Sequence, residues 1–131
     1  MRDKRVDQAE RGWLAQLYPL LQEHLGNVCD IHVVTLEPGV IRGNHFHLEA
    51  DEAFFLVTGT AKMAWKEAGN CVVCETKAGE ELVFYGRGTP HAIQNLTSST
   101  IVGIAFSNRM FDESNPDRHL EILLSSSGLT N

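Results

Sequence analysis

Short apolar runs separated by turn residues dominate the chain from Cys29 onward. The runs are rich in Val, Ile, Phe and Thr and lie between Gly, Asn and Pro signals, which is typical of β-strands. The pattern predicts strands at residues 29–36, 41–47, 52–57, 61–66, 71–75, 81–85, 91–96 and 100–107. Eight short strands at this spacing favour a sandwich or barrel over βαβ units.

The two ends of the chain follow a different pattern. Residues 8–25 place Trp13 and four leucines at near-helical spacing, which predicts a short N-terminal helix, although Pro19 would interrupt a long one. Residues 107–119 are polar and rich in turn formers. The apolar run at residues 119–124 predicts a final strand or a helical turn.

Composition limits the class of protein. The chain has 131 residues, 43% hydrophobic and 21% charged, so residues 1–131 are expected to form a single domain with a packed core. A net charge of -6 and the lack of a long Lys/Arg run argue against nucleic acid as a partner. The polar N-terminus and the absence of a long apolar stretch predict neither a signal peptide nor a membrane span, which favours the cytoplasm.

The three cysteines do not suggest a disulfide framework, because their number is small and odd. Cys71 and Cys74 form a CxxC pair, but no second pair accompanies them and they lie in a predicted strand. We therefore expect a structural role for them rather than a metal or redox site.

Three histidines and one glutamate have the spacing of a metal site. His45 and His47 are two apart in a predicted strand, so their side chains leave the same face. Glu52 opens the next run, which would place its carboxylate beside the imidazoles if strands 41–47 and 52–57 are neighbours. His91 follows the turn at residues 86–88. Three imidazoles and a carboxylate suit one divalent transition metal ion, such as Zn, Fe, Mn, Ni or Co, and leave room for water or substrate.

The same residues resemble the two motifs of the cupin family. Motif 1, residues 39–59, is similar to the family pattern in full, from Gly39 through His45, His47 and Glu52 to Gly59. Motif 2, residues 79–95, is looser: Gly88, His91 and Asn95 match, but Gly86 stands where the family usually has proline. The resemblance implies an all-β fold, a single double-stranded β-helix (cupin jelly-roll barrel) with its core at residues 29–107 and a short N-terminal helix. It also implies metal binding by His45, His47, Glu52 and His91, while Asn95 is expected to shape a turn.

Shorter similarities point toward sugar chemistry. Residues 42–47 (RGNHFH) and 10–13 (ERGW) look like cupin epimerase and ketoisomerase domains of nucleotide-sugar metabolism. Residues 111–112 and 115–117 look like the tail of metal-binding epimerase domains from capsular polysaccharide synthesis. These resemblances imply an epimerase or isomerase whose small-molecule substrate is a sugar or nucleotide-sugar, acting by proton abstraction next to a metal-polarised carbonyl group.

The general base is not identified by these similarities. In the metal-free epimerases that the chain resembles, the histidine matching His45 is the base and glutamine matches His47. Here His47 and Glu52 are both present, so His45 is assigned to the metal. Tyr85 and His32 are acid or base candidates by position, and Arg42 is either a ligand for phosphate or carboxylate or a solvated charge.

Two other functions and one assembly state stay open at this point. A site with three imidazoles and a carboxylate also suits an Fe-dependent dioxygenase, and the cupin fold serves non-catalytic small-molecule binding modules as well. A homodimer is expected, because strand edges and the apolar N-terminal segment need cover.

Overall fold

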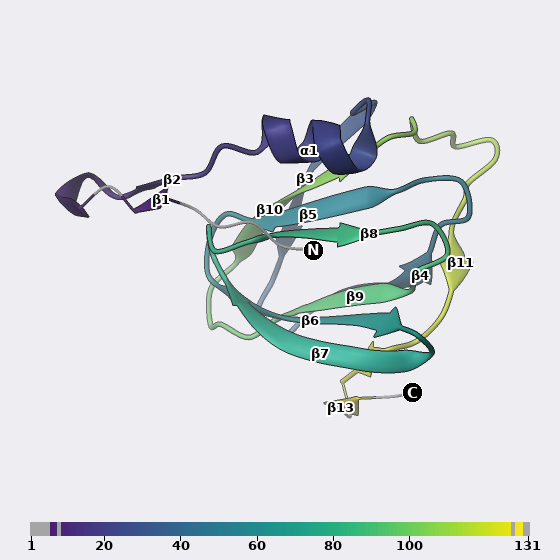
Figure 1. Ribbon diagram of the computed structural model, residues 1–131. Helices are drawn as coiled ribbons and strands as arrows, with labels where there is room; N and C mark the ends of the chain where they lie inside the picture. The colour runs from purple at the N-terminus through teal and green to yellow at the C-terminus, as the bar shows by residue number, and fades with distance from the viewer. Residues whose placement is uncertain (1–5, 8, 127, 130–131) are drawn as a thin grey trace.

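The computed structural model describes residues 6–7, 9–126 and 128–129, and its two main sheets are antiparallel and face each other (Figure 1). The first sheet has the order β3-β10-β5-β8, with bounds Asp30–Leu36, Ile101–Ser107, Glu52–Leu56 and Leu82–Tyr85. The second has the order β11-β4-β9-β6-β7, with bounds His119–Leu120, Ile41–Phe46, His91–Asn95, Thr60–Glu67 and Asn70–Lys77. The predicted all-β jelly-roll class is confirmed.

The predicted strands correspond one by one to β3 through β10, and their ends differ by at most two residues. Alternation of side chains explains how they pack. In β6, the inward-facing Ala61, Met63 and Trp65 belong to the core between the sheets, whereas Ala64 faces outward. In β5 both faces are buried, which explains its unbroken apolar run from Ala53 to Leu56.

The space between the sheets is apolar at one end and polar at the other. The closed end is filled by buried side chains that include Leu36, Leu56, Ala61, Met63, Ile93 and Ile101. There Asn95 is 2% exposed and its side-chain amide donates to the carbonyls of Leu36 and Ser99. The expectation that Asn95 shapes a turn is confirmed. The opposite end carries the polar residues described below.

The outer faces of both sheets are covered by the ends of the chain. Helix α1 (Tyr18–Leu25) lies on the first sheet (Figure 1), where Leu21 and Leu25 pack against a cluster that includes Phe55. Leu123 and Leu124 lie on the second sheet against Ala64 and Ala92. The run at residues 119–124 thus yields β11 and the start of β12 (Leu124–Ser125), which pairs with β13 (Gly128–Leu129).

The predicted helix at residues 8–25 is wrong over its first half. That stretch contains a 3-10 turn (Ala9–Arg11) and the short strand β2 (Trp13–Leu14), which pairs with β1 (Val6–Asp7). Pro19 lies in the first turn of α1, where its missing N–H costs no hydrogen bond. Pro19 therefore starts the helix instead of interrupting it. In the described part of the chain, no helix is long and apolar enough to cross a membrane.

Candidate functional site

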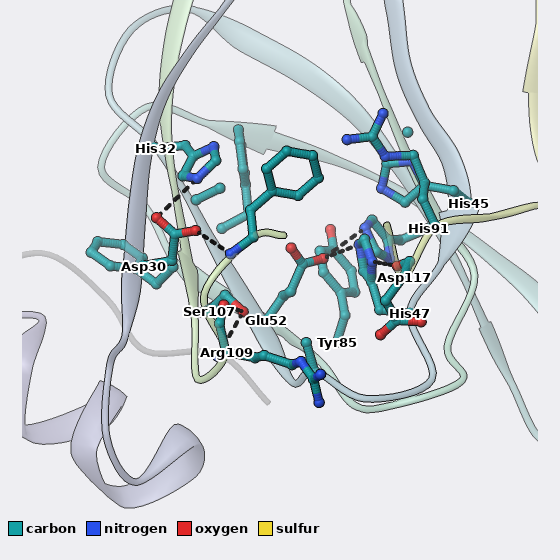
Figure 2. A pocket seen from close by; sticks show the side chains of 18 of the residues that line it. Asp30, His32, His45, His47, Glu52, Tyr85, His91, Ser107, Arg109 and Asp117 are labelled. Carbon is teal, nitrogen blue, oxygen red and sulfur yellow. Dashed lines mark hydrogen bonds and ion pairs between the residues drawn. The ribbon is translucent and has the colours of Figure 1, made fainter. Parts of the chain in front are cut away.

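A cavity of about 530 Å³ opens between the sheets at their polar end (Figure 2). It is bordered by the last residues of β4 and β8 and the first residues of β3, β5 and β9. All the site residues proposed from the sequence line this one cavity: His32, Arg42, His45, His47, Glu52, Tyr85 and His91. Their chemical roles stay predictions, and the geometry below bears on each.

Four side chains converge at the inner end of the cavity. One ligand atom each from His45, His47, Glu52 and His91 lies within 4.8 Å of all the others. The Oε1 atom of Glu52 is 2.9 Å from Nε2 of His47 and 3.3 Å from Nε2 of His91. In the described residues this is the one group of three or more His, Cys, Asp or Glu side chains with such convergence.

The carboxylate reaches the histidines from the opposite sheet. The sequence-based condition that strands 41–47 and 52–57 are neighbours is wrong, because β4 pairs with β9 and β11, whereas β5 pairs with β10 and β8. The short connection between β4 and β5 crosses from one sheet to the other. Glu52 therefore faces His45, His47 and His91 across the cavity, and the four side chains enclose a volume instead of lying along one surface.

A bulge in β4 brings the histidines close to β9. The register shifts between Gly43 and His45, and both Gly43 (φ 94) and Asn44 (φ 56) have positive φ. A Cβ atom on residue 43 would lie 2.8 Å from the carbonyl oxygen of His91, so only glycine allows this approach. The Asn44 side-chain oxygen accepts the N–H groups of Leu123 and Leu124, which anchors the C-terminal segment to the same bulge.

The imidazole orientations fit a bound metal ion. Nδ1 of His47 lies 2.5 Å from the carbonyl oxygen of Asp117, and Nδ1 of His91 lies 3.0 Å from that of Thr89. Each Nδ1 must therefore carry a proton and donate, which in the neutral rings leaves the Nε2 lone pairs facing Glu52. Nε2 of His47 is buried and makes no well-aligned hydrogen bond with any described residue. Among the described residues, its one close polar neighbour is the Glu52 carboxylate, and an imidazole nitrogen and a carboxylate oxygen that face each other in this way suit a shared metal ion.

Electrostatics distinguish His45, in β4, from His47, which directly follows β4. Burial, with the nearby His91 and His47, lowers the pKa of His45 to about 4, so this ring is neutral near pH 7. Burial alone would also lower the pKa of His47, but the Glu52 carboxylate outweighs it and the pKa of His47 is raised. Burial would raise the pKa of Glu52, yet His47 and His91 together lower it. Without an ion, Glu52 is therefore an ionised partner for the imidazoles.

Hydrogen bonds hold the turn before His91 in position, although motif 2 has glycine instead of the usual proline at residue 86. Thr89 N–H donates to the carbonyl of Gly86 at 3.0 Å, and Gly88 N–H donates to the carbonyl of His47 at 2.6 Å. The Asp51 carboxylate also accepts the N–H of Arg87 at 2.9 Å. These bonds hold the turn against the end of β4, so the missing proline at residue 86 does not displace His91.

Tyr85 forms part of the same inner wall. Its ring stacks on the imidazole of His91, with centroids 4.3 Å apart and planes 6° from parallel. Burial, followed by the nearby Cys74 and Glu52, raises the pKa of Tyr85 above its usual range. Tyr85 therefore keeps its proton at neutral pH and suits a hydrogen-bond or proton donor better than a base.

His32 and Arg42 lie nearer the mouth of the cavity. The His32 side chain is 54% exposed and its Nε2 lies 3.0 Å from the Asp30 carboxylate. Arg42 is exposed and donates from Nε to the carbonyl of Thr35 at 3.0 Å, which leaves its terminal nitrogens free to turn toward a ligand. Within the described residues, Arg42 makes no ion pair with a carboxylate.

The segment at residues 108–118 forms the outer wall, a role that the sequence pattern did not reveal. Here we name it the closing segment; it contributes Arg109, Met110, Phe111, Asp112, Asn115, Asp117 and Arg118 to the cavity. The Asp117 carboxylate accepts the N–H groups of Leu48 and Glu49 at 2.9 and 2.7 Å. Burial would raise the pKa of Asp117, but these two bonds outweigh it and the pKa is lowered. The similarity of residues 111–112 and 115–117 to epimerase tails was the one available signal.

The cysteine pair does not join the site. Residues three apart on a strand point to opposite faces, and Cys74 packs toward the core between the sheets whereas Cys71 packs with the outer cluster of Ala64 and Leu123. Their sulfur atoms therefore cannot converge on one ion from β7.

Two facing antiparallel sheets, with a His/Glu cluster at the open end of the barrel, define this chain as a cupin. The family model described as the polysaccharide biosynthesis C-terminal domain matches residues 8–119, and the chain belongs to this family.

Three known proteins place the chain among its relatives. A UDP-2-acetamido-2,6-beta-L-arabino-hexul-4-ose reductase from Pseudomonas aeruginosa is 30% identical over 88 residues, 65% of this chain and 24% of the relative. The capsular polysaccharide assembling protein CapF from Staphylococcus aureus has a TM-score of 0.65 and 28% identity, covering 71% of this chain and 27% of that one. QdtA, a sugar 3,4-ketoisomerase from Thermoanaerobacterium thermosaccharolyticum, has a TM-score of 0.72 and 16% identity over 90% of this chain and 85% of its own. The chain thus spans about a quarter of the length of the first two relatives.

Proposed function

We propose that this chain is an epimerase or isomerase that moves a proton next to the carbonyl group of a keto-sugar, most simply a nucleotide-linked one. The observation that carries the proposal is the convergence of His45, His47, Glu52 and His91 at the inner end of a cavity of about 530 Å³. This volume lies within the usual range for small-molecule sites. Relatives whose names refer to a UDP-linked keto-sugar and to sugar ketoisomerisation support the substrate class.

We further propose that the four side chains hold one divalent transition metal ion. Such an ion would supply a Lewis acid for a carbonyl oxygen. This donor set suits Zn, Fe, Mn, Ni and Co alike, since each of these ions accepts imidazole and carboxylate ligands. The fixed Nδ1 protons of His47 and His91 support the assignment, because they direct both Nε2 atoms into the cavity.

The other cavity residues divide the remaining tasks. Tyr85, which retains its proton, would donate a hydrogen bond or proton to the substrate oxygen as charge develops there. Arg42 at the mouth would bind a phosphate oxygen of the nucleotide by paired N–H groups. The inner walls are largely apolar, with Phe54, Met63 and Ile93, which suits the exclusion of water around a sugar ring.

Solvent deuterium tests the reaction type. The metal-loaded chain is incubated in D₂O with UDP-2-acetamido-2,6-beta-L-arabino-hexul-4-ose or TDP-4-keto-6-deoxyglucose, and loss of sugar C–H signals is followed by NMR while an electrode records oxygen. Deuterium entry that needs the metal and consumes no oxygen is expected. Substrate-dependent oxygen uptake would replace the proposal with the dioxygenase alternative, and neither signal would favour a binding module.

The homodimer also stays a proposal. Strand β3 is an edge of the first sheet, and Ile31 and Val33 on it are 61% and 72% exposed. Light scattering at micromolar concentration is expected to give twice the chain mass, and a monomer would contradict the proposal.

A further inference from the structure

A second pair of titratable side chains lies across the cavity from the His/Glu cluster of residues 45, 47, 52 and 91. Asp30 and His32 both line the cavity from β3, and the imidazole Nε2 lies 3.0 Å from Oδ1 of Asp30 (Figure 2). The other carboxylate oxygen, Oδ2, accepts the backbone N–H of Phe111 at 3.0 Å. The closing segment thus fixes the carboxylate, and the carboxylate orients the imidazole.

The proton on His32 is placed by these contacts. The Phe111 N–H lowers the pKa of Asp30, against a smaller opposing effect of burial, and His32 lowers it further. An ionised Asp30 accepts a hydrogen bond from Nε2–H, so the neutral His32 ring carries its free lone pair on Nδ1. In the described part of the chain Nδ1 of His32 has no hydrogen-bond partner. This is the opposite tautomer from that of His47 and His91, whose Nδ1 atoms donate to carbonyls.

The strand register sets the distance between the two groups. Asp30 is paired with Ser107, and Ser107 with Glu52, so Asp30 and Glu52 stand in one row two strands apart. Two strand spacings amount to about 10 Å between backbones. His32 lies in the adjacent inward row, where its neighbour on β10 is the small Ala105, which also lines the cavity. His32, Ala105 and the four cluster residues line the same cavity of about 530 Å³, which has room for a sugar ring between them.

We propose that His32 is the general base of the reaction and that Asp30 is its positioning residue, an assignment that rests on the proposed function. Nδ1 of His32 takes the proton from the carbon next to the carbonyl group. The electrons of that C–H bond form the carbon–carbon double bond of an enolate, and the carbonyl π electrons move to its oxygen, which faces Tyr85 and the cluster. In ketoisomerisation, the imidazolium gives the proton to the former carbonyl carbon, and the hydroxyl proton of the deprotonated carbon moves to the former carbonyl oxygen. In epimerisation, a water molecule protonates the same carbon on its opposite face and the imidazolium gives its proton to the resulting hydroxide, so no other reactant is consumed.

Two substitutions and a matched control test the pair. His32→Asn removes the base, and Asp30→Asn keeps the shape but cannot accept from both Phe111 N–H and His32 Nε2–H. The control is His119→Asn. His119 also pairs with an aspartate two residues before it, Asp117, at 3.2 Å, but the His119 side chain does not line the cavity. Metal content and circular dichroism of all three variants are expected to match the wild type.

The readouts are deuterium exchange into the two keto-sugars and the tautomer of His32 by ¹⁵N NMR. His32→Asn is expected to lower kcat by about 100-fold or more, with KM changed less than about threefold. Asp30→Asn is expected to lower kcat by about tenfold or more and to shift the His32 proton from Nε2 toward Nδ1. His119→Asn should stay within about twofold of the wild type.

Each failure has a distinct signature. If the wild type and the His32→Asn variant exchange deuterium at equal rates, the assignment of the base is overturned while the proposed function stands. An unchanged His32 tautomer in Asp30→Asn would overturn the positioning role. A wild type that exchanges neither keto-sugar would overturn the proposed function and this assignment with it.

Discussion

The inner end of the cavity and its mouth are built in different ways, although they are parts of one site. At the inner end, His45 and His91 lie on the paired strands β4 and β9, and His47 directly follows β4. The rings of His47 and His91 are fixed by backbone carbonyls. At the mouth, His32 and Arg42 are exposed and held by one or two bonds each. The inner cluster is therefore part of the folded framework, whereas the mouth is available for recognition. Substitutions at the inner end should alter metal content or stability, and those at the mouth should alter ligand turnover or binding alone.

The largest effect is expected for the inner histidines. His47→Ala and His91→Ala should each lower metal content to about a tenth or less of the wild type, because three donors bind far more weakly than four. Elemental analysis after dialysis measures the effect, and circular dichroism should show an intact fold, since both residues line a cavity. His119→Ala is the control. Wild-type metal content in both variants would remove the four-ligand assignment.

Gly43→Ala is expected to have the next largest effect, on the framework itself. The new Cβ would lie 2.8 Å from the carbonyl oxygen of His91 and would require alanine at φ 94. Strain and overpacking together should cost about 2 to 4 kcal/mol of the free energy of unfolding. The control is Gly69→Ala, which has φ 81 but nothing within 4 Å of its Cβ, and should cost about 1 to 2 kcal/mol. Equal urea concentrations at the unfolding midpoint of the two variants would show that a Cβ atom on residue 43 can be accommodated between β4 and β9.

The sequence was informative about the framework and less so about how its parts meet. Alternation and turn residues predict all eight main strands, and motif 1 predicts three of the four cluster residues. Neither predicts that Glu52 arrives from the opposite sheet, because alternation indicates which side chains share a face but not which strands pair. The helix boundary was missed because Pro19 is compatible with both a helix start and a helix break.

The closing segment was missed for another reason. It joins the site through its main chain, by the carbonyl of Asp117 and the N–H of Phe111. Backbone groups are the same at every residue, so no pattern of side chains can reveal these contacts. Its polar, turn-rich composition indicated a loop, and only the similarity of residues 111–112 and 115–117 to epimerase tails pointed to a role in the site.

Asp117 connects the two regions, and its replacement should have an intermediate effect. Asp117→Ala removes the acceptor for the N–H groups of Leu48 and Glu49, so the carbonyl of residue 117 loses its alignment with His47. Metal affinity is expected to fall about tenfold or more, as for other groups that orient a ligand. Competition with a fluorescent chelator measures it. Asp112→Ala is the control, since within the part of the chain that the structure describes the Asp112 side chain bonds inside its own turn, to Ser114. Equal affinities for the two variants would refute the coupling.

The smallest effect on the fold, and one confined to the mouth, is expected for Arg42→Ala. Among the described residues, the Arg42 side chain makes one hydrogen bond, to the carbonyl of Thr35, and this bond is exposed. The free energy of unfolding should therefore change by less than about 0.5 kcal/mol. If Arg42 binds a phosphate by paired N–H groups, calorimetry with UDP or TDP should show an affinity about tenfold lower, and Arg42→Lys should recover only part of it, because lysine supplies the charge without the fork geometry. Arg87→Ala is the matched control, since Arg87 does not line the cavity and lies 3.6 Å from Asp51. Full recovery of affinity in Arg42→Lys would mean that charge alone attracts the nucleotide. Unchanged affinity in Arg42→Ala would mean that Arg42 is a solvated charge and that β4 supplies no phosphate contact at the mouth.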